Sequence, residues 1–323
     1  MNIDDLLKIS VERSASDLHL KVGNHPVVRI NGTLHPLVEL KRLMPEDTIA
    51  MAFAMMNGEQ KDKFKRDHEI DMAYSIPGLG RFRCNVFYQR GAVGMVLRVI
   101  PTQIKSINDL NLPLVLEKIS QEMRGLVLVT GTTGSGKSTS LAAMIDYINI
   151  HRVEHIVTIE DPIEFLHNHK RCVVNQREVG TDTRSFPVAL RSALRQDPDI
   201  ILIGEMRDLE TIGIALTAAE TGHLVFATLH TQDCPQSVDR IIDVFPPHQQ
   251  EQIRVQIAAT LEGIVSQQLL AKAGTKGRSV ACEILVTTPA ARNLIREGKT
   301  HQLYTVMQTG TQYGMQTMNS SLA

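Results

Sequence analysis

The sequence has few cysteines, and none of them is spaced for metal binding. Its four are Cys84, Cys172, Cys234 and Cys282; no Cys-x-x-Cys pair occurs, and no histidine stands at zinc-finger spacing. Structural zinc sites are built from such pairs. We therefore predict reduced thiols that mostly pack in the interior, and no structural zinc site.

Long apolar runs and an excess of one charge are also missing. No stretch approaches the roughly 18 apolar residues of a membrane helix, and the opening MNIDDLLK carries acids where a secretory signal would be basic. Lys and Arg total 34 against 35 Asp and Glu, a formal net charge of -1, so the chain has no general basic field to hold a nucleic-acid backbone. These absences predict a cytoplasmic protein that does not bind nucleic acid.

The length and the pattern of the first hundred residues predict a two-domain protein. At 323 residues, with 43% hydrophobic and 21% charged residues, the chain exceeds one typical globular domain. Asn31-Gly32 marks a hairpin, and apolar spacing with Pro45 at the start predicts one or two helices over 45–67. Strand patterns follow at 69–75, 81–89 and 93–100, so we predict a small α+β domain over 1–100.

A change of pattern predicts an α/β domain over 114–323. Pro101 to Ser106 resembles a linker, and Asn111-Leu112-Pro113 is a second break, so the linker is predicted over 101–113. Short apolar runs then alternate with segments long enough for crossover helices, which indicates a mostly parallel sheet covered on both faces. The predicted strands are Leu126 to Thr130, Ile156 to Glu160, Asp199 to Ile203 and Leu224 to Thr228.

One segment carries a complete phosphate-binding signature. The string GTTGSGKS matches G-x-x-x-x-G-K-[ST] between a predicted strand and a predicted helix over 140–147. Backbone N–H groups and the helix N-terminus suit phosphate oxygens, the lysine suits the β- and γ-phosphates, and the serine hydroxyl suits Mg2+. A plain glycine turn would not require Lys-Ser. We predict ATP and Mg2+ at Gly131, Thr132, Thr133, Gly134, Ser135, Gly136, Lys137, Ser138 and Thr139.

Carboxylates at two strand ends are candidates for the hydrolytic chemistry. Glu205 follows the strand 199–203 and is the predicted general base, although an ordinary Walker B motif has Asp where Gly204 stands. Glu160, Asp161 and Glu164 form a second cluster, in which Glu164 is placed near the metal-bound water. We expect Mg2+ to be held by Ser138, with Glu164 and Glu205 reaching it directly or through water. A solvated acid at a strand end and a polar Asp-Pro turn are the plainer alternatives.

Histidines and arginines near these strands are less specific indicators of a catalytic site. His223 and His230 bracket the strand 224–229, where a histidine can sense the γ-phosphate or simply be a satisfied surface or core residue. Arg195 and Arg207 flank the Glu205 strand, and we expect them to pair with Asp197 and Asp208 rather than to bind phosphate.

Several strings together resemble one protein family. They are ASDLHL at 15–20, IEDPIEF at 159–165, LRSALRQDPD at 190–199, GEMRD at 204–208 and the stretch from Thr221-Gly222-His223 to Thr231. With the phosphate loop, they resemble the secretion ATPases of type II secretion and type IV pili over essentially the whole chain. The resemblance implies a PAS-like N-terminal domain, a RecA-like ATPase domain and a ring of six chains. It also implies catalytic-site roles for Glu164, Glu205 and His230.

Two features of the sequence are similar to those of the family members that drive pilus retraction. Extension and secretion members usually carry a tetracysteine zinc module and a longer N-terminal region, which this sequence lacks. AARNLIRE at 290–297 resembles the retraction motif AIRNLIRE, with Ala291 in place of Ile; without the family it would be an ordinary amphipathic surface helix. The family generally continues further beyond the string at 314–318, so this chain, ending at Ala323, is expected to be short or truncated.

The resemblance implies a set of partners as well. They are the other chains of a homohexamer, an inner-membrane platform protein of the pilus (PilC-like) and a paralogous accessory ATPase. The ring is expected at the inner membrane below the pilus, where ATP hydrolysis drives retraction and twitching motility. Rival functions are a pilus-extension or secretion ATPase, a nucleic-acid translocase, and an accessory retraction factor or nucleotide-gated switch with low turnover.

A locally positive segment is the last candidate. Between residues 81 and 105 the charged residues are Arg81, Arg83, Arg90, Arg98 and Lys105, without any Asp or Glu. We hypothesise that Arg81 or Arg83, together with Arg98, meets the γ-phosphate charge on a neighbouring subunit, as arginine fingers do. The alternative is a basic surface that pairs with acids elsewhere.

Overall fold

The computed structural model describes residues 2–101, 103–273 and 277–323. Its contacts divide the chain into two compact units, Met1–Thr102 and Gln103–Ala323. Ile107 and Leu112 are buried in the core of the second unit, so the part of the predicted linker from Ile107 onward packs with that unit. The domain limits 1–100, 101–113 and 114–323 stay predictions.

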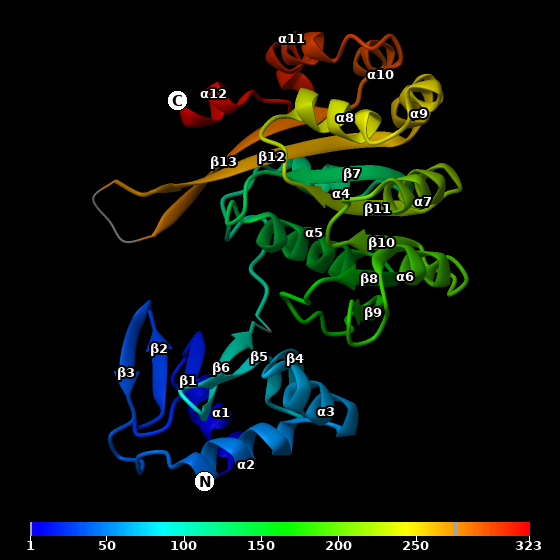
Figure 1. Ribbon diagram of the computed structural model, residues 1–323. Helices are drawn as coiled ribbons and strands as arrows, with labels where there is room; N and C mark the ends of the chain where they lie inside the picture. The colour runs from blue at the N-terminus through cyan, green and yellow to red at the C-terminus, as the bar shows by residue number, and fades with distance from the viewer. Residues whose placement is uncertain (1, 102, 274–276) are drawn as a thin grey trace. The chain divides into compact units, whose positions relative to one another are not determined.

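The first unit is one antiparallel sheet with helices on one face. The strand order is β3-β2-β1-β6-β5-β4 (Figure 1). The strands are β1 (Asp17–Leu20), β2 (Val27–Ile30), β3 (Thr33–Pro36), β4 (Glu69–Ile76), β5 (Gly80–Gln89) and β6 (Ala92–Ile100), and the helices are α1 (Ile3–Glu12), α2 (Pro45–Met55) and α3 (Gly58–Asp67). The predicted hairpin at Asn31-Gly32, the helices within 45–67 and the later strands are confirmed.

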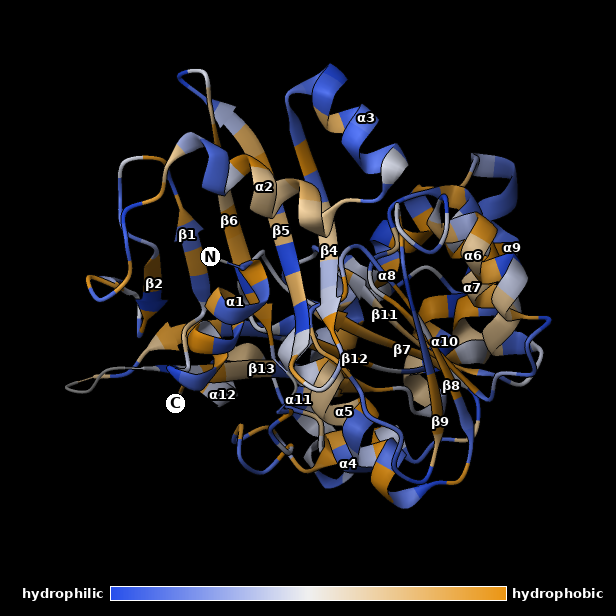
Figure 2. Cartoon of the chain, turned by 90° about the horizontal axis from the view of Figure 1, so that it is seen from below, coloured by the Kyte–Doolittle hydropathy of each residue, from blue (hydrophilic) through white to orange (hydrophobic). Residues whose placement is uncertain are grey.

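Alternation along the strands explains this one-sided packing. In β5, Phe82, Cys84 and Val86 are buried against the helices, while Arg81 and Arg83 point to the other face. Figure 2 shows the matching alternation of hydrophilic and hydrophobic residues along β5. The charged residues of these strands therefore share the face that the unit's own helices leave uncovered.

The second unit is a seven-stranded, mostly parallel sheet of order β13-β12-β7-β11-β10-β8-β9. Its strands are β7 (Gly125–Thr130), β8 (His155–Glu160), β9 (Val173–Glu178), β10 (Ile200–Ile203), β11 (Leu224–Leu229), β12 (Leu261–Ala271) and β13 (Arg278–Val286). The helices are α4 (Val115–Ser120), α5 (Lys137–His151), α6 (Phe186–Ala193), α7 (Leu209–Glu220), α8 (Cys234–Asp243), α9 (Pro247–Thr260), α10 (Pro289–Arg296), α11 (Leu303–Thr309) and α12 (Met318–Leu322), with short 3-10 turns at Thr300–Gln302 and Thr311–Tyr313.

Both faces of this sheet are covered. One face packs its alternate strand residues against α6 to α11, and the other packs against α4 and α5, so β7 and β11 are buried along their whole length. The predicted class, an α/β ATPase-type domain preceded by a smaller α+β domain, is confirmed. The sequence reading missed β9 and the pair β12–β13, in which β13 runs antiparallel at the sheet edge.

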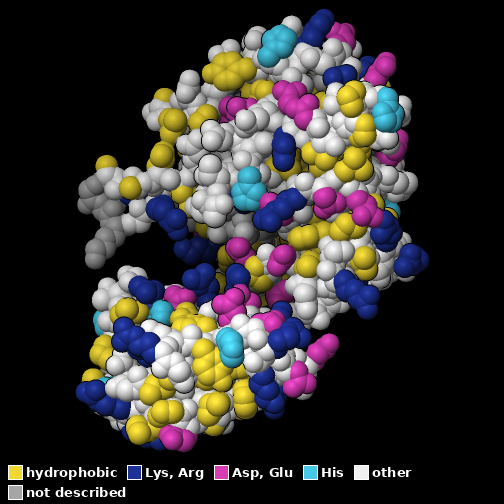
Figure 3. Space-filling view, viewed as in Figure 1, with side chains coloured by type: hydrophobic (Ala, Val, Ile, Leu, Met, Phe, Trp, Pro, Cys, Tyr) yellow, Lys and Arg dark blue, Asp and Glu magenta, His cyan; other side chains and the backbone are white. Residues whose placement is uncertain are grey.

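Other global predictions concern the cysteines, charge and membrane helices. All four cysteines are buried and unpaired, as predicted. Acidic and basic side chains are interspersed on the visible face of each unit (Figure 3), in keeping with the formal net charge of -1. Within the described residues, every helix is too short or too polar to cross a bilayer.

Candidate functional site

A cavity of about 540 Å³ lies at the carboxyl ends of the parallel strands of the second unit. Loops after β7, β8, β10 and β11 meet there, as is usual for ligand sites in open α/β sheets. The cavity is lined by Gly134, Gly136, Lys137, Ser138 and Thr139 of the predicted phosphate loop, by Glu160, Glu164, Glu205, Arg207 and His230, and by Leu269 and Arg278 of the β12–β13 pair. The sheet therefore brings together the P-loop and the predicted catalytic residues of this unit.

The phosphate loop joins β7 to α5, which begins at Lys137. The Lys137 side chain is buried, and its Nζ donates to the carbonyl oxygens of Gly131 at 2.8 Å and Thr132 at 3.1 Å. Burial lowers the pKa of Lys137, while the charges of Glu205 and Glu164 oppose that shift. A cation held by two neutral carbonyls and facing two carboxylates is well placed to exchange those contacts for phosphate oxygens.

Gly131 is required by its surroundings as well as by its backbone. Its φ of 141° lies in the region that favours glycine. A Cβ there would lie 2.4 Å from the backbone oxygen of Gln267 and 2.6 Å from Ser135 Oγ. Strand β12 therefore packs directly on the start of the phosphate loop.

Glu205 lies just beyond β10 and has an arginine and a histidine as partners. Arg207 donates to both of its carboxylate oxygens, with Nη2 2.6 Å from Oε2, and His230 Nε2 lies 3.1 Å from Oε1. Burial raises the pKa of Glu205, but the Arg207 hydrogen bonds and the charges of His230 and Arg207 outweigh burial and hold it below its usual value. Glu205 is thus an ionised carboxylate at neutral pH, as a general base must be.

The geometry explains why glycine replaces the usual Walker B aspartate at position 204. A Cβ on Gly204 would lie 3.1 Å from Glu160 Cα and 3.2 Å from the backbone oxygen of Ile159. Both contacts are with backbone, which cannot move aside without distorting β8. The close approach of β8 and β10 therefore leaves the carboxylate role on this strand to Glu205.

The second acidic cluster divides into partly buried and exposed members. Glu160 is partly buried and accepts hydrogen bonds from Thr158 Oγ1 at 2.7 Å and Gln176 Nε2 at 3.1 Å; burial raises the pKa of Glu160 despite them. Asp161 and Glu164 are exposed and line the cavity. Of the three, the Glu160 carboxylate is therefore fixed by hydrogen bonds within the protein, while the Glu164 carboxylate is exposed and can face a ligand.

These side chains suit a magnesium ion. Mg2+ prefers oxygen ligands and keeps several waters, and the cavity offers the Ser138 hydroxyl with the carboxylates of Glu164 and Glu205. Glu205 and Glu164 both act on the pKa of Lys137, so the carboxylates and the phosphate loop lie within electrostatic reach of one another. The donor set fits a nucleotide-bound Mg2+.

The structure decides between the interpretations of two residues, His223 and Arg195, and corrects the expected partner of Arg207. His223 lies at the amino end of β11, where its Nδ1 is 3.0 Å from the Ala218 carbonyl oxygen, so it is at the opposite end of the strand from the site. Arg207 pairs with Glu205 rather than with Asp208, which instead caps α7 through the Thr211 N–H at 2.8 Å. Arg195 is exposed and does not line the cavity.

The sequence reading also missed cavity residues. Leu269 and Arg278 come from strands that it did not predict, and Phe165, His167 and Phe186 line the cavity without belonging to a phosphate-binding signature. IEDPIEF, which includes Phe165, was the available signal for one of them. For the hairpin, the segment Leu261 to Ala271 alternates too little to indicate a strand.

The arginines of the first unit form part of a cross-strand row. Asp17 on β1 faces Arg29 on β2 and Arg98 on β6, and Arg98 faces Arg83 on β5. Arg98 Nε donates to Asp17 Oδ1 at 3.0 Å, so Arg98 has the acidic partner that the alternative interpretation expected. Arg81 precedes Arg83 by two residues and lies on the same face. A role for Arg81, Arg83 and Arg98 in another subunit stays a prediction.

Comparisons with known proteins agree with this geometry. A family model described as "Type II/IV secretion system protein" matches residues 2–322. The chain is 50% identical to the type IV pilus retraction ATPase PilT of Pseudomonas aeruginosa, covering 100% of this chain and 93% of that protein. It is 46% identical to the type IV pilus ATPase PilU of the same organism, covering 100% and 84%. A crystal structure of the retraction motor PilT with bound ADP superposes with a TM-score of 0.91 at 50% identity, covering 100% and 92% of the two chains.

Proposed function

The chain belongs to the type II/IV secretion system protein family, and from that premise we propose that it is an ATP-hydrolysing motor that powers type IV pilus retraction. The observation that carries the proposal is the cavity in which the phosphate-loop lysine, the base Glu205 and its partner His230 meet. The 50% identity to a retraction ATPase over the full chain supports the direction of the motor.

In the proposed reaction the loop Gly131 to Thr139 wraps the phosphates, and Lys137 leaves its carbonyl partners for the β- and γ-phosphate oxygens. Bound Mg2+, held by Ser138 with Glu164 and Glu205, would neutralise phosphate charge. Glu205 orients the attacking water and accepts its proton, and His230 fixes the carboxylate that does so. Phosphate leaves, and ADP remains on the loop.

We further propose that six chains form a ring and that hydrolysis takes place between neighbours. Arg81 or Arg83, with Arg98, would meet the γ-phosphate of the next chain; Arg98 would first have to leave Asp17. The segment Pro101 to Ser106 is the proposed hinge, because Ile107 and Leu112 are already fixed in the second unit. The ring would act from the cytoplasmic side on an inner-membrane platform protein (PilC-like).

A second function is favoured by one comparison. The 46% identity to PilU over the full chain supports an accessory retraction ATPase as the alternative, with a paralogous motor as its partner. A pilus-extension ATPase is the more distant alternative. A strain without this chain separates them: a sole retraction motor leaves hyperpiliated cells that do not twitch, an accessory factor leaves weak twitching, and an extension ATPase leaves bald cells.

The biochemical test uses the purified full chain. Wild-type protein should bind ADP and hydrolyse ATP, with specific activity rising with protein concentration as rings form. Lys137→Ala should lose binding, whereas Glu205→Gln should bind normally and fail to hydrolyse. Hydrolysis that persists in Glu205→Gln would remove the general base from the proposal.

A further inference from the structure

The loop between β8 and β9 carries Glu164, one of the two carboxylates that act on the phosphate loop. Glu164 is exposed and lines the cavity, and its charge reaches Lys137, where it opposes the lowering of the lysine pKa by burial. A carboxylate on a loop keeps one geometry toward a ligand only if the backbone that carries it is held in place. The contacts that hold this loop therefore bear on the nucleotide site.

Helix α5 holds the far end of the loop. Asn149 is fully buried in that helix, and its side-chain amide forms three hydrogen bonds of 2.7 to 3.2 Å with backbone groups of Asn168, Lys170 and Cys172. This end of the loop is thereby fixed to the helix that follows the phosphate loop. All three contacts lie beyond Glu164, so they leave the position of that residue to other contacts.

Strand β9 supplies such contacts through Gln176. β9 is the edge strand beside β8 (Figure 1). Gln176 Oε1 accepts a hydrogen bond from the His167 N–H at 2.8 Å, and Nε2 donates to the Phe165 carbonyl oxygen at 2.9 Å and to Glu160 Oε1 at 3.1 Å. One side chain thus joins both ends of the short segment that contains Glu164.

A second β9 side chain holds the segment on the other side of Glu164. Glu178 is buried, stands two residues along β9 on the same face as Gln176, and accepts at Oε2 from the Ile163 N–H at 3.1 Å. The residue before Glu164 and the residue after it are therefore both bound to β9 side chains. Burial raises the pKa of Glu160, and a hydrogen bond from the Glu164 backbone partly opposes that rise, so Glu160 holds the same backbone from inside the loop.

We infer that Gln176 is a positioning residue for Glu164, because it fixes the backbone from which that carboxylate faces a nucleotide-bound Mg2+. The inference rests on the proposed function, which gives Glu164 its role at the metal. A neutral amide suits this position because it donates and accepts at once, whereas a carboxylate at residue 176 would repel Glu160. Among the described residues, Gln176 is not one of those that line the cavity, so its effect on a nucleotide passes through the loop.

The first test separates positioning from general support of the fold. Gln176→Met keeps the length of the side chain but removes all three hydrogen bonds. In steady-state ATP hydrolysis by the full chain it should lower kcat roughly tenfold, the usual effect of losing a residue that orients a metal ligand, and leave KM for ATP within about twofold of wild type. Glu164→Gln should lower kcat as well. Added to Glu164→Gln, Gln176→Met should cause no further loss, because its effect passes through that carboxylate.

The second test follows the loop without nucleotide, metal or turnover. Hydrogen exchange with mass spectrometry should show protection in wild-type fragments that cover 161–167, since the N–H groups of Ile163 and His167 have side-chain acceptors. Gln176→Met should speed exchange in these fragments and leave it unchanged at the end of the loop that Asn149 holds. Unprotected 161–167 fragments in the wild type would contradict the inferred support, whatever the variants do.

Asn175 provides a matched control. It is exposed on the opposite face of β9, where its Nδ2 lies 2.8 Å from His155 Nε2, so Asn175→Ala removes an amide from the adjacent position on the side away from the loop. This control should leave kcat and the exchange of 161–167 as in the wild type. Thermal unfolding without nucleotide checks that Gln176→Met and Asn175→Ala fold as the wild type does.

The outcomes are distinct. If Gln176→Met has the wild-type kcat, or causes the same fold loss with and without the Glu164 carboxylate, the positioning role is overturned and the proposed function stands. A wild-type kcat in Glu164→Gln would remove the role that Gln176 supports, and the inference with it. Wild-type protein that hydrolyses no ATP would refute the proposed function itself, and the positioning role with it.

Discussion

Arg292 in the AARNLIRE segment is held inside the second unit, and its removal should destabilise that unit. Its Nη1 donates to the carbonyl oxygens of Ala258 at 2.8 Å and Ala259 at 2.9 Å, and its Nη2 lies 3.0 and 2.9 Å from the two carboxylate oxygens of Glu262. The two carbonyls belong to the last turn of α9, which has no helical donors for them. One side chain thus caps a helix and neutralises a partly buried acid.

The cost of Arg292→Ala follows from these contacts. The Arg292 and Glu262 side chains are 25% and 22% exposed, so the pair is more protected than a surface ion pair. Losing it with two carbonyl hydrogen bonds, and leaving Glu262 without a cation, should cost about 2–4 kcal/mol of unfolding free energy. Arg292→Lys should retain part of this stabilisation because it keeps the positive charge, but not all of it, since an ammonium group lacks the bidentate geometry of guanidinium.

The loss should also depend on pH. Burial raises the pKa of Glu262, and Arg292 opposes that rise; without Arg292 the folded-state pKa rises further above the unfolded value. A carboxyl with a raised folded pKa destabilises the fold when ionised, and this penalty vanishes below the unfolded pKa. The difference between wild type and Arg292→Ala should therefore be largest above neutrality and shrink as pH falls toward 4.

Urea unfolding of the full chain, followed by far-UV circular dichroism at pH 8 and pH 5, measures this effect. Glu262→Gln and the double variant with Arg292→Ala complete a double-mutant cycle. We expect the double variant to cost less than the sum of the single variants. If Arg292→Ala lowered the free energy of unfolding by less than about 0.5 kcal/mol, the usual range of a surface substitution, the proposed stabilising role of Arg292 would be refuted.

Three further predictions concern the nucleotide site. Glu205→Gln should lower ATP hydrolysis at least about a hundredfold, the usual worth of a general base, with ADP affinity by calorimetry unchanged; a smaller loss would place the base elsewhere. Arg207→Ala removes the partner that lowers the Glu205 pKa, so the acid limb of the pH–rate profile of ATP hydrolysis should move to higher pH. Arg195 is exposed, and Arg195→Ala should leave the acid limb where it is in the wild type. Equal pH–rate profiles for the two variants would contradict the pairing of Arg207 with Glu205. Gly204→Ala should lower the free energy of unfolding by about 1–3 kcal/mol through overpacking, as measured by thermal unfolding. The control is Gly213→Ala, because a Cβ on the helical Gly213 meets nothing within 4 Å. Equal stability of the two alanine variants would show that β8 can shift to accommodate the Cβ.

The sequence predicted the site best where a residue type suited to nucleotide chemistry stands directly after a predicted strand. The phosphate loop needs particular residue types at fixed spacing directly between a strand and a helix, so Lys137 and Ser138 were identifiable from local pattern alone. Glu205 was found because a carboxylate at the end of a buried strand faces the ligand edge. His223 and His230 look equivalent in sequence, and only the direction of β11 separates them by placing their ends at opposite edges of the sheet.

Contacts between segments far apart in sequence were beyond such reasoning. The partner of Arg207 depends on the turn after β10, where Asp208 is already used to cap α7. The strands β12 and β13 alternate too little to be separated from helical patterns, and β13 reverses the parallel order. The amphipathic pattern of 290–297 predicted α10 but gave no sign that Arg292 reaches back to Glu262, 30 residues away.

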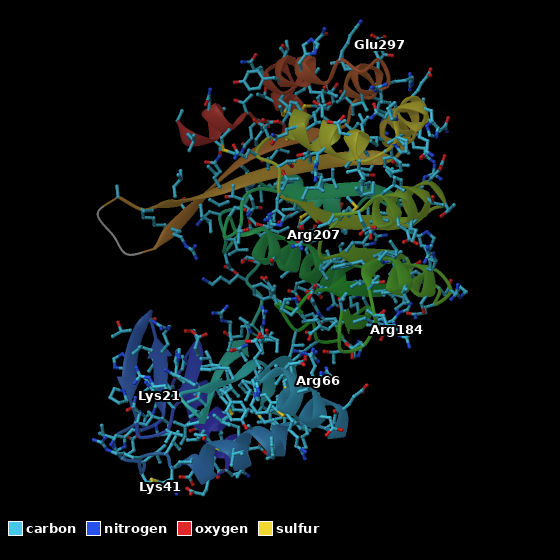
Figure 4. All side chains as sticks on the ribbon, viewed as in Figure 1. Lys21, Lys41, Arg66, Arg184, Arg207 and Glu297 are labelled. Atoms are coloured by element: carbon cyan, nitrogen blue, oxygen red, sulfur yellow. The ribbon has the colours of Figure 1, made fainter. Side chains whose placement is uncertain are left out.

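Strand β12 gives the AARNLIRE segment a physical connection to the nucleotide site. Glu262, held by Arg292, lies where the β12–β7 register shifts, between Leu261 and Gly263. Gln267, five residues further and roughly 16 Å along the strand, contacts the phosphate loop. In Figure 4, Glu297 at the end of α10 lies well away from Arg207, which lines the cavity. A change at Arg292 therefore has a route to nucleotide affinity through the position of β12. Loss of retraction in an Arg292 variant would report coupling only if stability and ADP affinity remained those of the wild type.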